Sequence, residues 1–199
     1  MKILHVPFGY YPDSVGGTEV YVAALAHELT RLGTDNVIAA PGQTTVHYQH
    51  AGLDVFRYAI NPNLSDLDAL YGDGDPVAEA SFAAVLDQVQ PDVVHLHALT
   101  SAISLRTVQV CQRRGLPVVF TYHTPTVSCV RGTLLRGGTD VCAGKLDVRL
   151  CTECLLHKHG VGAPFNTLFA VVPPVISDLA QGRQGGVWTA LRMRSLVHK

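Results

Sequence analysis

Four cysteines lie close together in the second half of this 199-residue chain, with the spacing C-x12-C-x8-C-x2-C. A C-x2-C pair with two further cysteines can supply a tetrahedron of thiolates, which zinc fills without redox chemistry. The surrounding segment contains few apolar residues, and a bound metal would order such a segment. We therefore predict a structural zinc site formed by Cys129, Cys142, Cys151 and Cys154.

Other states of these cysteines stay open from the sequence alone. Two disulfides, an iron–sulfur cluster and free thiols would each be compatible with the spacing, although disulfides fit poorly with a reducing cytoplasm. His157 or His159 could replace one cysteine as a ligand. The fifth cysteine, Cys111, lies in a helical stretch with apolar neighbours, which indicates a core residue.

A second group of chemistry-bearing residues consists of histidines in or after strand-like runs. His95 and His97 alternate in one run, so their side chains should point to the same face of a sheet. His123 follows another run and has threonine neighbours in Thr-Tyr-His-Thr. Imidazoles can donate or accept hydrogen bonds and exchange protons near neutral pH. We predict functional roles for His97 and His123, whereas His95 and His5 are more typical of structural histidines.

A third candidate is the step Gly16-Gly17-Thr18, where a loop enters a helix. Glycines let a ligand approach the backbone closely, and a helix N-terminus presents free N–H groups to phosphate. The alternative is a tight turn that needs positive φ. The step is not the G-x-G-x-x-G dinucleotide fingerprint, which argues against an NAD enzyme.

These candidates depend on a regular alternation of strands and helices over the first 122 residues. Strands are predicted at 2–8, 37–40, 55–60, 92–97 and 116–122, and helices at 18–32, from residue 76 and at 100–114. This alternation predicts a doubly wound, Rossmann-like α/β fold with a parallel sheet of order 3-2-1-4-5. Strands 1, 4 and 5 are then neighbours, so Gly16, Gly17, His97 and His123 should meet in one crevice at their carboxyl ends.

The rest of the chain breaks this rhythm. Residues 123–160 are predicted to be a Cys-rich, irregular insertion with one short helix at 151–159. Residues 161–199 are predicted to be helical, and we expect them to stop before the end of the domain. Residues 179–199 contain Trp188 and four basic residues but no acidic residue, so this segment could dock on an anionic membrane. We favour core packing or disorder as the interpretation of this segment.

Composition narrows the functional class. The net charge is −1, which gives no broad basic face for nucleic acid. No run of 18 uncharged apolar residues is present, and the apolar N-terminal run is too short for a secretory signal. We expect a cytoplasmic protein, with the inner face of the membrane as a second location.

Three segments together resemble the N-terminal domain of family 4 glycosyltransferases. They are Gly16-Gly17-Thr18-Glu19, residues 91–97 (PDVVHLH) and residues 116–123 (LPVVFTYH). The likeness covers about residues 1–125, and residues 129–154 resemble an insertion found in a subset of that family. Such enzymes have the GT-B fold, in which two Rossmann-like domains face each other across a cleft.

The resemblance implies transfer of a sugar from a nucleotide-diphosphate donor to a hydroxyl of a carbohydrate or lipid-linked acceptor, with retention of configuration. It places the Gly16-Gly17-Thr18 loop against the donor phosphates or the acceptor, and His123 and Thr124 beside the reacting sugar. We assign His123 to substrate positioning and transition-state stabilisation. No catalytic metal is implied. The C-terminal domain that grips the nucleotide is expected to be absent, so this fragment alone should be inactive.

The main alternative is a non-catalytic module, in which a Rossmann-like domain with a zinc-ordered loop recognises a sugar, a phosphate or a protein. An oxidoreductase or a Cys-dependent hydrolase is disfavoured, because the chain has neither G-x-G-x-x-G nor a G-x-S-x-G nucleophile turn.

Overall fold

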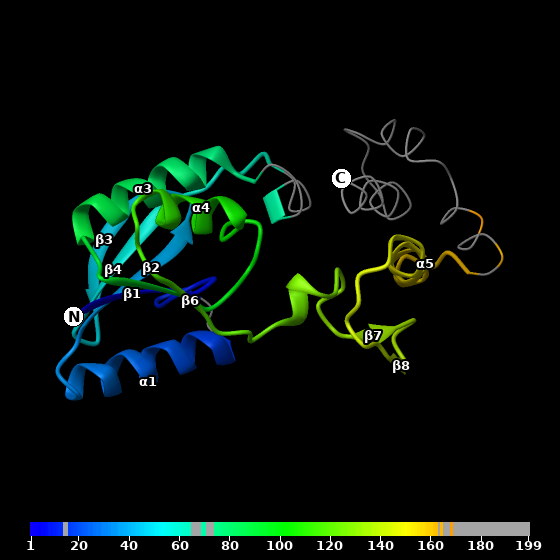
Figure 1. Cartoon of the computed structure of the whole chain (residues 1–199), viewed down its shortest axis with the longest axis horizontal. Coiled ribbons are helices and arrows are strands. Elements are labelled where there is room, and N and C mark those ends of the chain that lie inside the picture. Colours follow the sequence, from blue (N-terminus) through cyan, green and yellow to red (C-terminus); the bar gives the residue numbers. More distant parts are fainter. Residues whose placement is uncertain (14–15, 65–68, 71–73, 163, 165–167, 169–199) are drawn as a thin grey trace. The chain divides into compact units, whose positions relative to one another are not determined.

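The computed structural model describes residues 1–13, 16–64, 69–70, 74–162, 164 and 168 (Figure 1). The chain forms two compact units, Met1–His123 and Thr124–Lys199. The first contains a six-stranded sheet and the second a two-stranded sheet.

The large sheet has the strand order β3-β4-β2-β1-β5-β6. Its parallel strands confirm the predicted order 3-2-1-4-5. They are β1 (Lys2–Val6), β2 (Asp35–Gly42), β4 (Leu53–Ala59), β5 (Val93–Leu96) and β6 (Val118–Phe120). The fold is therefore the doubly wound, Rossmann-like α/β class expected from the sequence.

The sixth strand, β3 (Val46–His50), was not predicted from the sequence. It pairs antiparallel with β4 at the edge of the sheet. Ala51 and Gly52 connect the two strands, and both have positive φ, as a two-residue hairpin turn of type I′ requires. Ala51 is an unusual residue for that turn, and the strand is polar and largely exposed, so neither turn chemistry nor apolar pattern signals it.

Helices cover both faces of the sheet (Figure 1). On one face α1 (Gly17–Arg31) packs Val22 and Ala26 against Ile38. On the other face α3 (Pro76–Val89) and α4 (Leu105–Arg113) cover a larger core that includes Leu4 and Val6. Because side chains alternate along a strand, His5 points to the α1 face.

Helix α4 begins later than predicted, at Leu105 instead of residue 100. The Thr100 hydroxyl accepts hydrogen bonds from the backbone N–H groups of Ala102 and Ile103, both at 3.3 Å. Such local side-chain bonds compete with helix formation and hold residues 100–104 as a turn.

The second unit has more regular structure than the sequence suggested. A 3-10 turn at Pro125–Val127 precedes a hairpin of β7 (Leu135–Arg136) and β8 (Asp140–Val141). Helix α5 (Val148–Lys158) follows, three residues earlier than predicted, because Asp147 accepts a hydrogen bond from Leu150 N–H and caps it. The helical prediction for 161–199 falls almost entirely outside the described residues.

The helices within the described part of the chain include none with the length and apolar character needed to cross a bilayer.

We predict that Asp75→Ala lowers the free energy of unfolding by about 2 kcal/mol. The buried Asp75 carboxylate caps α3 by accepting from Val77 N–H at 2.8 Å, and it also accepts from Asn61 N–H at 2.7 Å. Urea denaturation should detect the loss. As a control, Asp87→Ala removes only an exposed ion pair with Arg114, so it should cost under about 0.5 kcal/mol. Equal losses in the two variants would contradict this account of α3.

Candidate functional site

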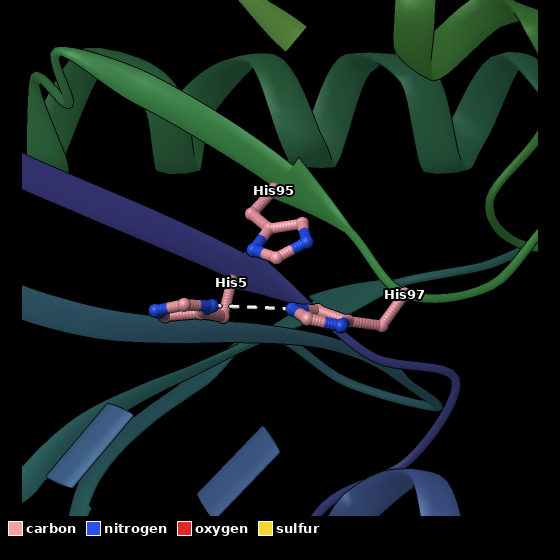
Figure 2. Close-up of side chains that lie close together, drawn as sticks. All are labelled: His5, His95 and His97. Carbon is pink, nitrogen blue, oxygen red and sulfur yellow. Dashed lines mark hydrogen bonds between the residues drawn. The ribbon is translucent and has the colours of Figure 1, made fainter. Parts of the chain in front are cut away.

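Three histidines meet on the α1 face of the sheet, where β1 lies beside β5 (Figure 2). His5 and His95 are direct partners in the strand register, and His97 follows two residues later. One ring nitrogen from each histidine lies within 4.8 Å of the others. The rings of His95 and His97 are 3.9 Å apart between centroids.

Hydrogen bonds hold two of these imidazoles to polar partners on neighbouring segments. His5 Nε2 contacts Asn36 Oδ1 at 3.0 Å, and His95 Nε2 contacts Thr121 Oγ1 at 2.7 Å. His5 Nδ1 lies 3.2 Å from His97 Nε2. Among the described residues, the buried Nδ1 of His97 has no hydrogen-bond partner.

Burial keeps these histidines uncharged. Burial, together with a smaller effect of the neighbouring imidazoles, lowers the pKa of His97 to about 2 and that of His95 to about 4. Burial also lowers the pKa of His5, against a smaller opposing effect of its bond to Asn36. Neutral imidazoles can hold a divalent cation or hydrogen-bond a hydroxyl, but they offer no positive charge to a phosphate.

His123 continues this cluster towards the start of α1. Its ring is 5.7 Å from that of His97 and 4.9 Å from that of Tyr21, measured between centroids. His123 is partly buried, and its Nε2 is buried without a partner among the described residues. The Tyr21 side chain is 44% exposed, so this end of the cluster reaches the protein surface.

Tyr21 was not identified from the sequence. A signal for it exists in hindsight: it follows Gly17 by four residues, so both lie on the same face of α1. The ring of Tyr21, near the beginning of α1, lies beside the rings of His97 and His123. The predicted strand order places these segments at the same edge of the sheet. His97 itself is fully buried. The structure does not test the ligand roles of these residues, which stay predictions.

The Gly16-Gly17 step is not explained by backbone strain. Gly16 has φ −110°, and neither glycine is among the residues with positive φ, so the turn interpretation does not hold. Apart from its own helix and chain neighbours, the described residues place no atom within 4 Å of a Cβ added at Gly17.

The carboxylate of Glu19 already occupies part of this helix N-terminus. Glu19 Oε2 accepts a hydrogen bond from Gly16 N–H at 2.8 Å, and its side chain is buried. A ligand phosphate placed here would therefore lie near a negative charge. Thr18, the next predicted binding residue, is partly exposed, and Thr124 is exposed at the start of the second unit.

The four clustered cysteines line one cavity of about 220 Å³ in the second unit. Cys151 and Cys154 come from consecutive turns of α5, Cys142 follows β8 directly, and Cys129 precedes the hairpin. All four are free thiols. Among the described residues, only the histidine cluster brings three ligand atoms within 4.8 Å of one another, so the sulfurs are not drawn together as tightly.

The thiols nevertheless influence one another. Burial raises the pKa of Cys151, and the neighbouring Cys142 and Cys129 raise it further. Burial also acts to raise the pKa of Cys129, but four backbone groups at residues 131–134 hydrogen-bond its sulfur and lower the pKa overall. Backbone N–H groups directed at one sulfur stabilise a thiolate, the form that binds metals.

Comparisons with known proteins found a matching family and a similar solved structure. A family model described as Glycosyltransferase Family 4 matches residues 15–140. No curated protein matches the chain. Among solved structures, sucrose-phosphate synthase from Thermosynechococcus elongatus is similar with a TM-score of 0.49 and 14% identity. The match covers 81% of this chain, which spans 40% of the synthase chain.

We predict that stability falls as the pH drops below about 6.5, the pKa of histidine in an unfolded chain. The unfolded chain then binds protons that the buried histidines cannot, so acid favours unfolding. His97 should contribute about 1.4 kcal/mol per pH unit. In urea denaturation between roughly pH 6 and 4.5, His97→Gln should make the slope shallower by about that amount. His157→Gln, at an exposed position of α5, is the matched control and should keep the wild-type slope. An unchanged slope in His97→Gln would show that His97 is protonated in the folded protein.

Proposed function

Because the chain belongs to glycosyltransferase family 4, we propose that it forms the acceptor-side domain of a retaining enzyme that uses a nucleotide-diphosphate sugar. One observation carries this proposal: His97, His123 and the start of α1 converge beyond the carboxyl ends of β1, β5 and β6. Open parallel α/β sheets bind their ligands at this edge.

The electrostatics of the site favour a sugar over a phosphate. The imidazoles of His95 and His97 are neutral at physiological pH, and Glu19 adds a buried carboxylate at the start of α1. Neutral nitrogens suit the hydroxyls of a carbohydrate or lipid-linked acceptor. We therefore assign the cations that hold the donor diphosphate to a second, donor-binding domain.

His123 is the residue to which we assign the main catalytic role. Its ring is partly buried, and its Nε2, which has no partner among the described residues, is suited to a hydrogen bond with the reacting sugar. A hydrogen bond that is stronger in the transition state than in the ground state speeds the reaction without tightening substrate binding. Thr18, Gly16, Gly17 and Thr124 are proposed to contact the substrates around it.

We predict that His123→Ala lowers kcat by roughly 10²-fold or more and changes KM little, as expected for loss of one transition-state contact. The test uses the full transferase, with its donor identified from a panel of nucleotide sugars. His47→Ala, on the exposed edge strand β3, is the matched control and should keep its kcat. Unchanged kcat in a folded His123→Ala protein would remove His123 from the mechanism, and no transfer from any nucleotide sugar would contradict the proposed function.

We also propose that Cys129, Cys142, Cys151 and Cys154 hold a structural zinc ion. Support comes from their common cavity, from the absence of disulfides among them, and from the backbone groups around Cys129 that favour its thiolate. Zinc binds thiolate sulfur at about 2.3 Å, so binding requires the four side chains to close in on the ion. The metal would order the second unit and take no part in transfer.

Protein purified without chelator should contain about one zinc per chain by elemental analysis, and Cys154→Ser should lose most of it. Cys111→Ala is the control, because Cys111 is buried in the core of the first unit and should not affect zinc content. Chelation should make residues 124–160 sensitive to protease while the large sheet stays folded. Metal-free protein with an equally resistant second unit would refute the zinc site.

A further inference from the structure

The side-chain amide of Asn36 has a fixed orientation. Its Nδ2 group lies 3.2 Å from the Thr34 carbonyl oxygen, which can only accept a hydrogen bond. The same nitrogen donates to the hydroxyls of Thr34 at 2.8 Å and Thr30 at 3.0 Å. Asn36 Oδ1 is therefore the atom that faces His5, and it can act only as an acceptor.

This orientation determines where the proton of His5 sits. His5 Nε2 is 3.0 Å from Asn36 Oδ1, so Nε2 must carry the proton and donate it. A neutral imidazole has one N–H group, so His5 Nδ1 has a free lone pair. That lone pair faces His97 Nε2 at 3.2 Å (Figure 2).

The same reasoning extends to His97. Its Nε2 must donate to His5, which leaves its Nδ1 as a lone-pair acceptor. The described residues offer this buried Nδ1 no donor. A buried acceptor without a partner costs about 1–3 kcal/mol, so the position indicates a group that arrives from outside the protein. Burial lowers the pKa values of both histidines, which keeps a second proton off either ring.

We propose that Asn36 and His5 are positioning residues that lock His97 in its Nε2–H tautomer, so that Nδ1 is a permanent acceptor for a sugar hydroxyl. The ligand class rests on the proposed function, whereas the tautomer chain rests only on the hydrogen bonds. Because His97 is fully buried, a side chain beside it must move to admit the hydroxyl. We assign this movement to Tyr21, which is half-exposed and whose ring centroid is 6.0 Å from that of His97 and 4.9 Å from that of His123.

The lock gives the site a chemical preference. A fixed lone pair accepts a hydrogen bond from a hydroxyl, and it repels a carboxylate or phosphate oxygen. A metal ion held by His5, His95 and His97 is the competing arrangement. A metal bound through His97 Nε2 would take the position of the proton that this nitrogen carries in our proposal.

Nitrogen-15 NMR of the histidine rings in this chain tests the lock directly. At about pH 7 both His5 and His97 should be protonated on Nε2 and unprotonated on Nδ1. Asn36→Leu removes the acceptor, and His97 should then show a mixture of tautomers. Asn36→Asp keeps an acceptor oxygen and should retain the single tautomer. The wild-type spectrum alone tests the predicted tautomers of His5 and His97, even if Asn36→Leu does not fold.

Three results would overturn the proposal. They are a proton on His97 Nδ1, an unchanged single tautomer in folded Asn36→Leu, and zinc bound to His97 Nε2 in the wild-type protein. In the full transferase, Asn36→Leu should raise KM for the hydroxyl substrate at least threefold, and Asn36→Asp should restore it. An unchanged KM would refute the ligand role alone. Absence of transfer would refute the proposed function and leave the tautomer result standing.

Discussion

The pairing of β1 with β5 places polar side chains in the interior of the protein, from which water is excluded. Strands of a parallel sheet covered by helices are buried on both faces, so any polar group on them needs a partner. His5 and His95 are opposite each other in this pairing, and Asn36 and Thr121 supply the partners. His97 differs, because its buried Nδ1 has no hydrogen-bond partner among the described residues.

The same burial sets the chemistry of the site. Because the imidazoles are neutral, the carboxyl edge of the sheet presents hydrogen-bonding groups without a positive charge, and Glu19 adds a negative one nearby. Such a surface suits the sugar side of a transfer reaction better than the diphosphate side. This is why we propose that the cations that hold the donor diphosphate belong to a second domain.

The sequence predicts the order of the parallel strands because apolar runs and helical stripes alternate clearly along the first unit. With strands 1, 4 and 5 adjacent, the approach of His97 to His123 also follows from the sequence. The contact between His5 and Asn36 cannot be predicted from the sequence, because it depends on the β1–β2 register, in which Ile3 pairs with Asn36. The cysteine spacing predicts that the four cysteines lie near one another. The distances between their sulfurs depend on the β7–β8 hairpin, whose strands of two residues are too short to show an alternating apolar pattern in the sequence.

The central claim is that a sugar binds where α1, β5 and β6 meet. The most direct measurement is an NMR titration of this chain with a panel of glycosides, following the ring signals of all its histidines. The account predicts that a binding glycoside perturbs His97 and His123 and leaves His47, on the edge strand, unchanged. Perturbation confined to His157 and His159 at the C-terminal end of α5, or no perturbation by any glycoside, would contradict it.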